Sequence, residues 1–478
     1  MNRRIILSLL GKLVLIEGVC MLLPALVGAF YREREAIGIL VVAVIVIAAG
    51  LLLHLVKAEN RKIRAREGFV ITGMSWLILS LIGAVPFLIS GAIPHFTDAV
   101  FEASSGFTTT GASVLPDPSV LPHCVLLWRS FTHWIGGMGV LTFMLLFIPS
   151  NADEINIMRA ESPGPSVEKL TPRIRESALI LYAIYTAMTV VLIIALVLSG
   201  MPVFDSVCHA FGTAGTGGFG VRADSLAGYS VASQNTITVG MLLFGVNFGV
   251  YFLILRKKFK DLLHSEEVLW YFAAYLIAVA LVTAGTLHGV HSAGQTLQSA
   301  FFQVASIMTT TGYSTVDFGL WAAMPQAVLV LVMFLGACAG STGGGMKVSR
   351  WVLYIKQIFR ELRSYTHPNS VKTIRLDGRV VGEKTLRTAN IYLMAYVAIY
   401  VLSFLLVSFD RFDLTTTFTS IAATINNIGP GLGTVGPSGN YAGFSLLSKW
   451  TLIFDMIAGR LELIPILVIL APNTWLRK

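Results

Sequence analysis

The sequence predicts an all-α polytopic membrane protein: two N-terminal helices, then four helix/re-entrant pore helix/helix repeats around a central pseudo-fourfold pore. Three observations predict this fold class: an apolar composition, ten segments long enough to span a bilayer, and a glycine-containing segment that recurs four times. The chain has 478 residues, of which 55% are hydrophobic and only 13% are charged. Soluble globular proteins carry about 25% charged residues. Most of this chain therefore cannot face water.

Charge and cysteine content exclude several other classes of protein. The net charge is +9, but the basic residues fall between long apolar runs and form no single patch, which argues against nucleic-acid binding. The four cysteines are scattered and include no C-x-x-C pair, so neither a disulfide framework nor a zinc cluster is indicated. His288 and His291 likewise have no metal-like partners. The first apolar run is too long for a typical signal peptide and contains Glu17, so we interpret it as a membrane helix that is retained.

Ten segments have the length and apolar character of a spanning helix, which needs about 20 residues. They lie at 5–30, 36–56, 69–91, 125–148, 177–199, 236–255, 268–287, 326–346, 388–408 and 446–470.

The connections between these segments alternate in charge. Of the 35 Lys and Arg residues, 28 lie in every second connection or at the termini: 1–12, 57–67, 149–176, 256–267, 347–387 and 477–478. Cytoplasmic loops carry the excess of Lys and Arg. An even number of spans then places both termini in the cytoplasm.

The last four outward-facing connections each contain a moderately apolar stretch that is too short to span, which is typical of re-entrant segments. They are 96–114, 203–221, 295–316 and 412–435. Aligned on their last common glycine, they place Gly111, Gly218, Gly312 and Gly429 at intervals of 107, 94 and 117 residues. This is a fourfold internal repeat.

The repeat also divides the chain into units. Asp98 and Asp205 stand 13 residues before their glycines, where we expect them to cap the start of a short helix. The predicted units are a two-helix N-terminal extension, 1–67, and four pore repeats, 68–176, 177–267, 268–387 and 388–478.

Four such glycine turns predict a pore for a monovalent cation. Non-helical backbone at membrane depth is tolerated only where it is buried in protein or lines a water-filled cavity. A helix that stops midway directs its partly negative carbonyl end at the membrane interior, which favours a cation. Glycine carbonyls and the threonine runs at 108–110 and 309–311 supply neutral oxygens that can replace a hydration shell. A divalent-cation filter would show a ring of carboxylates, whereas Glu102 occurs in one repeat only.

Several long motifs, in the right order, resemble the membrane subunit of the bacterial Trk-type potassium uptake systems, within the Trk/Ktr/HKT superfamily. They are TTTG in repeats one and three, WIGGMG at 134–139, GSTGGGMK at 340–347, NNIGPGLG at 426–433 and GRLE at 459–462. The resemblance covers essentially the whole chain. Repeat two departs from it most, with Gly215, Thr216 and Gly217 where repeats one and three have three threonines.

The resemblance implies potassium uptake through a selective, channel-like pore, with potassium as the bound metal ion and no organic cofactor on this chain. The implied potassium filter consists of Thr109, Thr110, Gly111, Gly217, Gly218, Thr310, Thr311, Gly312, Asn427, Ile428 and Gly429. The implied gate loop lies beneath the filter and consists of Gly336, Gly340, Ser341, Thr342, Gly343, Gly344 and Gly345.

The residues themselves support a loop at this position. Its glycines interrupt the second helix of repeat three, and each costs about 1 kcal/mol in a helix interior. The helix should therefore break at mid-membrane. The alternative interpretation is a close helix crossing that uses small residues.

Arg460 lies within the last apolar segment, where an ionisable residue is costly and indicates a functional role by default. The resemblance places it beside the pore, below the filter, as a charge barrier that limits cation flux. The alternative is a structural ion pair with Asp455 or Glu462.

The resemblance further implies a multi-pass protein of the bacterial inner membrane that forms a homodimer in membrane lipid. A cytoplasmic nucleotide-binding regulatory subunit would form a ring beneath it, and the basic segment 347–387 could receive that partner.

Two competing classes of function remain. A secondary transporter of another solute also uses broken helices, but such folds usually show two inverted repeats. An enzyme has least support, because the sequence shows neither a nucleophile–base pair nor a metal cluster. Residues 215–220 fit the G-x-G-x-x-G fingerprint, yet they fall on an outward-facing turn instead of in a βαβ unit.

Overall fold

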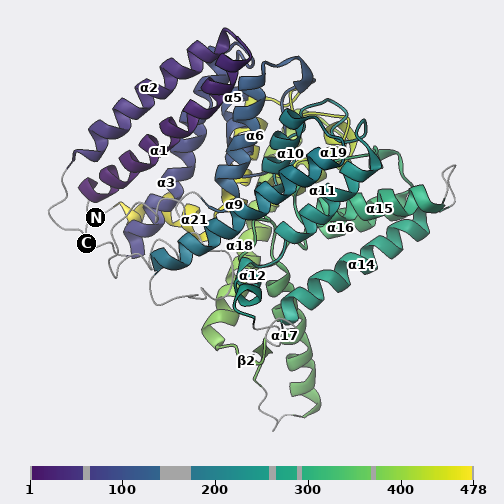
Figure 1. Cartoon of the computed structure of the whole chain (residues 1–478). Helices are drawn as coiled ribbons and strands as arrows, with labels where there is room; N and C mark the ends of the chain where they lie inside the picture. The colour runs from purple at the N-terminus through teal and green to yellow at the C-terminus, as the bar shows by residue number, and fades with distance from the viewer. Residues whose placement is uncertain are drawn as a thin grey trace.

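The computed structural model describes residues 3–56, 65–139, 174–257, 265–287, 293–367 and 373–475. These residues form helices, apart from connecting loops and one two-stranded hairpin, and the helices surround a central region where the short helices end (Figure 1). His288, His291 and residues 477–478 lie outside the described residues.

The N-terminal pair consists of α1 (Arg3–Phe30) and α2 (Glu35–His54), which lie side by side at one edge of the molecule (Figure 1). Glycine allows their close approach, since a Cβ on Gly50 would lie 2.5 Å from the backbone nitrogen of Leu15. The connection between them is fixed to the rest of the protein by Glu33, which accepts hydrogen bonds from the amides of His123 (2.7 Å) and Cys124 (2.9 Å). Partial burial raises the pKa of Glu33, but these hydrogen bonds outweigh it and lower the pKa overall.

Four helical groups follow in chain order. The first contains α3 (Ala65–Gly83), α4 (Val85–Ile89), α5 (Phe96–Phe107), η1 (Pro118–Val120) and α6 (His123–Gly137). The second contains α9 (Ile174–Leu198), α10 (Val203–Gly215), α11 (Val231–Phe244) and α12 (Phe248–Leu255). The third contains α14 (Glu266–Thr286), α15 (Ala293–Met308), η2 (Phe318–Leu320), α16 (Ala323–Met333) and α17 (Val348–Thr366). After the antiparallel hairpin of β1 (Arg375–Leu376) and β2 (Arg379–Val380), the fourth contains α18 (Glu383–Val407), η3 (Ser408–Asp410), α19 (Leu414–Ile425), η4 (Gly433–Val435), α20 (Leu446–Arg460), α21 (Ile464–Leu470) and η5 (Pro472–Thr474).

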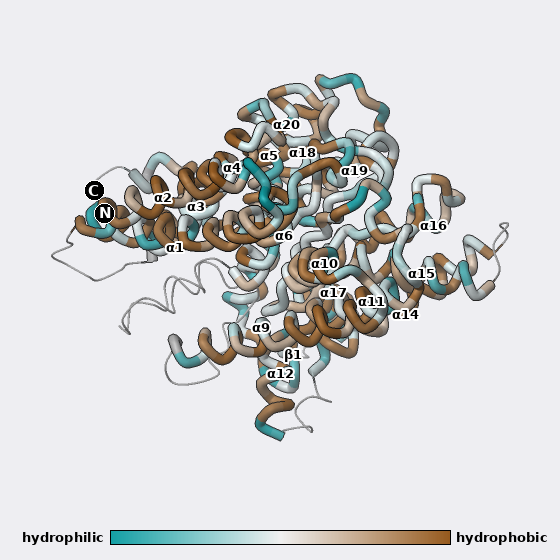
Figure 2. Tube along the Cα trace, turned by 45° about the horizontal axis from the view of Figure 1, so that its top comes forward, coloured by the Kyte–Doolittle hydropathy of each residue, from teal (hydrophilic) through white to brown (hydrophobic). Residues whose placement is uncertain are grey.

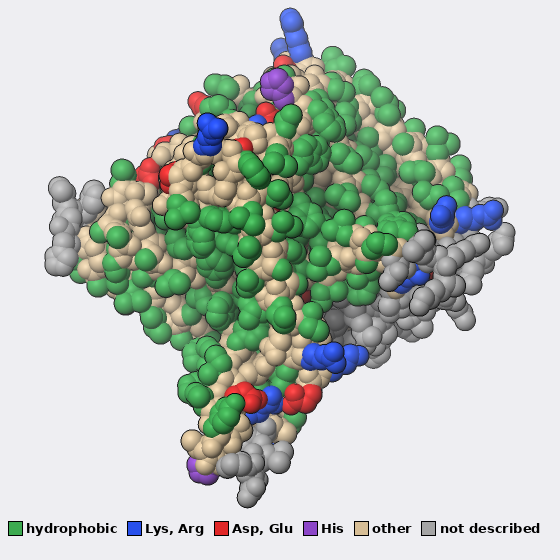
Figure 3. All heavy atoms as spheres, turned by 180° about the vertical axis from the view of Figure 1, so that it is seen from behind, with side chains coloured by type: hydrophobic (Ala, Val, Ile, Leu, Met, Phe, Trp, Pro, Cys, Tyr) green, Lys and Arg blue, Asp and Glu red, His purple; other side chains and the backbone are tan. Residues whose placement is uncertain are grey.

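Each group has the same sequence of elements: a long helix, a short helix, a turn, and a second helix. Among the described residues, six helices are long and apolar enough to cross a membrane, and the pair α11 and α12, bent by 89°, brings the number to seven. Apolar residues run along α1, α2, α9 and α14 in Figure 2. Hydrophobic side chains cover most of the face in Figure 3, with charged side chains toward its upper and lower ends and at its right-hand edge. This distribution is that of a membrane protein.

In groups one, two and four, the second helix is not the continuous span that the sequence predicts. The predicted spans at 236–255, 326–346 and 446–470 break after Phe244, Met333 and Arg460, and the described part of the predicted span at 125–148 leaves helix at Gly137. The breaks occur where the second helix meets the end of a short helix: a Cβ on Gly136 would lie 1.8 Å from the Phe107 carbonyl, and one on Gly459 would lie 1.9 Å from that of Ile425. The break in the glycine-rich helix after Met333 confirms the prediction of a loop there.

The predicted helix caps are wrong. Asp98 and Asp205 lie in the first turns of α5 and α10, whose N-cap residues are His95 and Pro202. Both carboxylates have tertiary partners instead: Asp98 pairs with Lys449 of α20 at 2.6 Å, and Asp205 accepts from Tyr229 at 2.7 Å. The tertiary bonds to Lys449 and Tyr229 outweigh a hydrogen bond at the local helix cap, which would contribute about 1 kcal/mol.

Candidate functional site

The four short helices α5, α10, α15 and α19 end three or four residues before Gly111, Gly218, Gly312 and Gly429. Residues 108–111, 215–218, 309–312 and 426–429 continue from these ends and together form what we call the glycine ring. The carbonyl end of each helix, with about half a negative charge, thus lies next to the ring.

The four segments of the ring share one backbone conformation. Two residues before each ring glycine, the backbone adopts the left-handed conformation, although none of these four residues is glycine. They are Thr109, Thr216, Thr310 and Asn427, with φ of 54°, 56°, 60° and 56°. The ring glycines are also left-handed, with φ from 78° to 98°. A left-handed conformation is uncommon outside glycine, so its fourfold recurrence at one position marks a shared structural requirement.

One hydrogen bond also recurs in all four segments. The amide that precedes each ring glycine donates to the carbonyl five residues earlier, from Thr110 (2.8 Å), Gly217 (2.7 Å), Thr311 (2.9 Å) and Ile428 (2.8 Å). This bond folds the chain back against its own short helix in the same way in every group.

Contacts between neighbouring segments close the ring. A Cβ on Gly111 would lie 2.1 Å from the carbonyl oxygen of Gly217, and one on Gly218 would lie 1.9 Å from that of Thr311. A Cβ on Gly312 would lie 1.9 Å from the carbonyl oxygen of Ile428, and one on Gly429 would lie 2.7 Å from that of Thr110. Each glycine therefore touches the backbone carbonyl of the next group, in the cyclic order one, two, three, four, one.

Side-chain oxygens add to the carbonyls of the ring. Thr108 and Thr110 share a hydrogen bond of 2.8 Å, and Thr309 and Thr311 share one of the same length. The Thr109 hydroxyl is buried and finds no hydrogen-bond partner among the described residues. A buried hydroxyl without a partner is costly, and a bound cation would relieve that cost.

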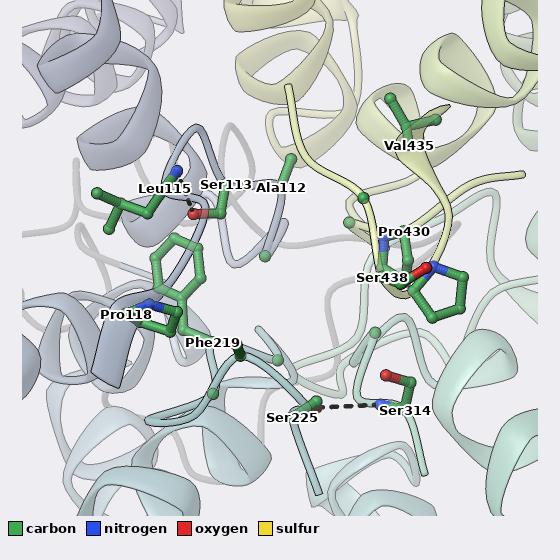
Figure 4. A pocket seen from close by; sticks show the side chains of 18 of the residues that line it. Ala112, Ser113, Leu115, Pro118, Phe219, Ser225, Ser314, Pro430, Val435 and Ser438 are labelled. Carbon is green, nitrogen blue, oxygen red and sulfur yellow. Dashed lines mark hydrogen bonds between the residues drawn. The ribbon is translucent and has the colours of Figure 1, made fainter. Parts of the chain in front are cut away.

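A cavity of about 110 Å³ opens on one side of the ring. Its walls come from the chain that follows each ring glycine: Ser113 from the first group, Phe219 and Ser225 from the second, Ser314 from the third and Pro430 from the fourth surround it in Figure 4. Ser314 donates its amide to the Ser225 hydroxyl at 3.2 Å and so joins two of these walls (Figure 4). The described charged residues that line the cavity are Arg129 and Arg222; no carboxylate does so.

A loop, residues 334–347, lies on the other side of the ring between α16 and α17. We call it the buried loop, since most of its residues are buried, although Gly340 is exposed. It contacts three of the four ring segments. The Gly344 amide donates to the Thr310 hydroxyl (2.6 Å), and the Thr216 hydroxyl donates to the Thr342 carbonyl (3.0 Å). A Cβ on Gly344 would lie 2.7 Å from the carbonyl oxygen of Asn426. Glycine is therefore required for this close contact with the ring.

Two charged residues that sequence reasoning missed hold the buried loop in place. Glu267 of α14 is 6% exposed and accepts the amides of Ala339 (2.7 Å) and Ser349 (3.1 Å), which flank the loop's centre on both sides. Lys347 is also buried and donates from Nζ to the Gly343 carbonyl. In the sequence Glu267 is simply one more charged residue at the edge of an apolar segment, so no pattern distinguishes it.

Arg460 joins the buried loop to the first group. Its guanidinium donates to the Thr342 carbonyl (2.7 Å) and to the carbonyls of Gly136 (2.8 Å) and Gly137 (2.6 Å) at the end of α6. The two carboxylates considered as its partners form other bonds: Glu462 pairs with Arg350 at 2.5 Å, and Asp455 accepts from Ser403 at 2.7 Å.

The structure thus brings most of the sequence-predicted site residues together. Thr109, Thr110, Gly111, Gly217, Gly218, Thr310, Thr311, Gly312, Asn427, Ile428 and Gly429 all belong to the glycine ring. In the buried loop, Gly336 packs against Gly345, while Thr342, Gly343 and Gly344 lie under the ring. Gly340 and Ser341 bond to residues outside the ring: the Gly340 carbonyl accepts the Phe248 amide, and the Ser341 hydroxyl donates to the Cys338 carbonyl within the loop.

Comparisons with known proteins place the chain among cation transport proteins. The model of the TrkH family, described as a cation transport protein, matches residues 35–476. The chain is 36% identical to the Trk system potassium uptake protein TrkH of Salmonella typhimurium, over 99% of this chain and 100% of that protein. It is 30% identical to TrkG of Escherichia coli over 99% and 98% of the two chains. The crystal structure of the potassium transporter TrkH from Vibrio parahaemolyticus superposes with a TM-score of 0.88, at 31% identity and full coverage of both chains.

Proposed function

Because the chain belongs to the TrkH family of cation transport proteins, we propose that it takes up potassium across the bacterial inner membrane through the glycine ring, which acts as a selectivity filter. The observation that carries this proposal is the closed ring itself, in which each glycine meets a backbone carbonyl of the next group. Four chain segments that share one backbone conformation can enclose an ion pathway, which a single turn cannot do.

The chemistry of the ring and the cavity favours a monovalent cation. Neutral carbonyl and hydroxyl oxygens can replace the hydration shell of potassium. Divalent cations prefer carboxylate ligands. Among the described residues, no carboxylate lines the cavity. The four helix ends add negative potential without fixed charge. In this proposal the cavity opens to the outside, and both termini lie in the cytoplasm.

The buried loop acts as the gate in this proposal. It lies directly against Thr216, Thr310 and Asn426 of the ring, on the side away from the cavity. An ion that leaves the ring on that side meets the loop, so conduction requires the loop to move. The chain then acts as a homodimer in membrane lipid, with a cytoplasmic nucleotide-binding subunit docked near α17 and the β hairpin, which project from the helical body in Figure 1.

Transport by the purified protein tests the proposed function. In proteoliposomes with potassium outside, we expect uptake of potassium or its analogue rubidium to exceed uptake of sodium, and we expect no uptake of a labelled amino acid. Empty liposomes give the background. Amino-acid uptake without potassium flux would contradict the proposal and favour the secondary transporter.

Arg460→Ala is expected to raise potassium flux through the open pore. The guanidinium lies beside the buried loop, and the screened repulsion between it and a passing cation is on the order of 1 kcal/mol. Flux per folded protein should therefore rise about fivefold.

Arg460→Lys is the matched control, since it keeps the charge and should keep flux near that of the wild type. If Arg460→Ala lowers protein yield and leaves flux per folded protein unchanged, the arginine is a structural tie between α6 and the buried loop and forms no barrier.

A further inference from the structure

The position nine residues before each ring glycine is polar in all four groups, which neither the composition nor the motifs indicate. The residues are Glu102, His209, Gln303 and Ser420. All four are fully buried on the short helices. A buried polar side chain requires a hydrogen-bond partner, so the partners at this position indicate its role.

Two of these side chains make the same contact. The Glu102 carboxylate accepts the Val114 amide at 3.0 Å, and the Gln303 amide oxygen, in the orientation that satisfies both of its neighbours, accepts the Thr315 amide at 2.9 Å. Val114 and Thr315 both stand three residues after their ring glycine. In groups one and three, the short helix therefore holds the chain where it leaves the ring for the cavity.

Glu102 differs from Gln303 in having a cationic partner. Arg129 of α6 donates from Nε to the Glu102 carboxylate at 2.6 Å, and both side chains are buried. The same guanidinium donates to the Gly220 carbonyl at 2.9 Å and lies 3.5 Å from the centre of the Phe219 ring. Gly220 stands two residues after Gly218. The ion pair thus joins the outgoing chains of groups one and two.

The pair also determines the charge at the cavity. Arg129 lines the cavity together with Ser113 and Phe219, and the last two are labelled in Figure 4. Its positive charge there would repel an entering cation, and the Glu102 carboxylate neutralises it. We propose that Glu102 and Arg129 are positioning residues for cation entry: they hold the outgoing chains of two groups, and Glu102 neutralises the charge of Arg129 at the cavity. The other cation on the cavity wall, Arg222, lies 3.9 Å from the Asp205 carboxylate. This inference rests on the proposed function of the ring.

The test is a charge cycle read out as the half-saturation concentration of potassium uptake in proteoliposomes. Glu102→Gln keeps an acceptor for Val114, as Gln303 does naturally for Thr315, but leaves Arg129 uncompensated. We expect half-saturation to rise roughly three- to tenfold, the range for one uncompensated charge at intermediate effective dielectric, with a smaller change in maximal rate. The double variant Glu102→Gln/Arg129→Gln removes both charges and should return half-saturation to near the wild-type value.

Gln303→Glu tests the same electrostatics with the opposite sign, because it places a carboxylate at the equivalent position of group three. We expect it to lower half-saturation. Glu383→Gln is the matched control: its carboxylate pairs with Arg360 at 2.7 Å but is largely exposed on α18, and we expect no change.

Two outcomes overturn the inference. One is a half-saturation concentration in Glu102→Gln equal to that of the wild type. The other is a loss of rate that is the same in the single and double variants, which indicates a purely structural pair. Failure of the proposed function is distinct, since the wild-type protein would then show no preference for potassium.

Discussion

Replacing Gly312 with serine is expected to abolish the preference for potassium over sodium, and to do so more completely than the same change at Gly429. A Cβ at Gly312 would lie 1.9 Å from the carbonyl oxygen of Ile428 and 2.9 Å from Pro430, whereas a Cβ at Gly429 would lie 2.7 Å from the carbonyl oxygen of Thr110. Ordinary contact begins near 3.4 Å, so the carbonyl at Ile428 must move by more than 1 Å. A shift of that size removes one oxygen from the position that replaces the hydration shell.

The measurement is the ratio of rubidium to sodium uptake in proteoliposomes, normalised to folded protein. Backbone strain needs its own control, because serine is disfavoured at positive φ wherever it stands. Gly91→Ser provides it: Gly91 has φ of +70°, and its Cβ would meet no atom within 4 Å. We expect Gly91→Ser to keep the wild-type ratio. A folded Gly312→Ser protein with the wild-type ratio would show that the glycine ring does not select the ion.

The recurrence of the site could be predicted from sequence, because glycine spacing after a short apolar helix is a local pattern. Aligning the repeats on Gly111 and its three equivalents was enough to identify the four turns. The order in which they meet is a tertiary property. That Gly111 faces Gly217, and Gly429 faces Thr110, follows only when all four groups are assembled.

The predictions that were wrong fail for a related reason. Continuous spans were predicted at 236–255 and 446–470, because hydropathy measures apolar content and is insensitive to a short break. Asp98 was predicted as a cap from its place in the sequence, yet Lys449, 351 residues away, determines its partner. Glu267 gave no signal at all, since its bonds to Ala339 of the buried loop and Ser349 of α17 are made across 72 and 82 residues.

Excising residues 338–343 from the buried loop is expected to produce a pore that conducts potassium without any regulatory partner. The ends of the excision already lie close together, because the Val348 amide donates to the Ala337 carbonyl at 3.1 Å and Gly336 packs against Gly345. The contact of Thr342 with Thr216 disappears, while the contacts that close the ring are made by other residues. If small residues here only permit close helix packing, the same excision should destabilise the protein and lower flux.

If the buried loop is the gate, as proposed, Glu267→Ala should open it without shortening the chain. A gate needs closed and open states within a few kcal/mol of each other, so that a partner's differential binding can shift them. Hydrogen bonds to a charged acceptor contribute about 1.5–3 kcal/mol, and Glu267 accepts one from Ala339 of the loop and one from Ser349 in the first turn of α17, just after it. Losing these bonds should raise basal flux at least about tenfold. The basal flux of Glu267→Gln, which keeps an acceptor oxygen, should lie between those of Glu267→Ala and the wild type.

Both variants are compared by flux per folded protein in vesicles without the partner. If neither the excision nor Glu267→Ala conducts more than the closed wild type, the buried loop is no gate. If the excision alone conducts, the loop is the gate but Glu267 does not hold it shut.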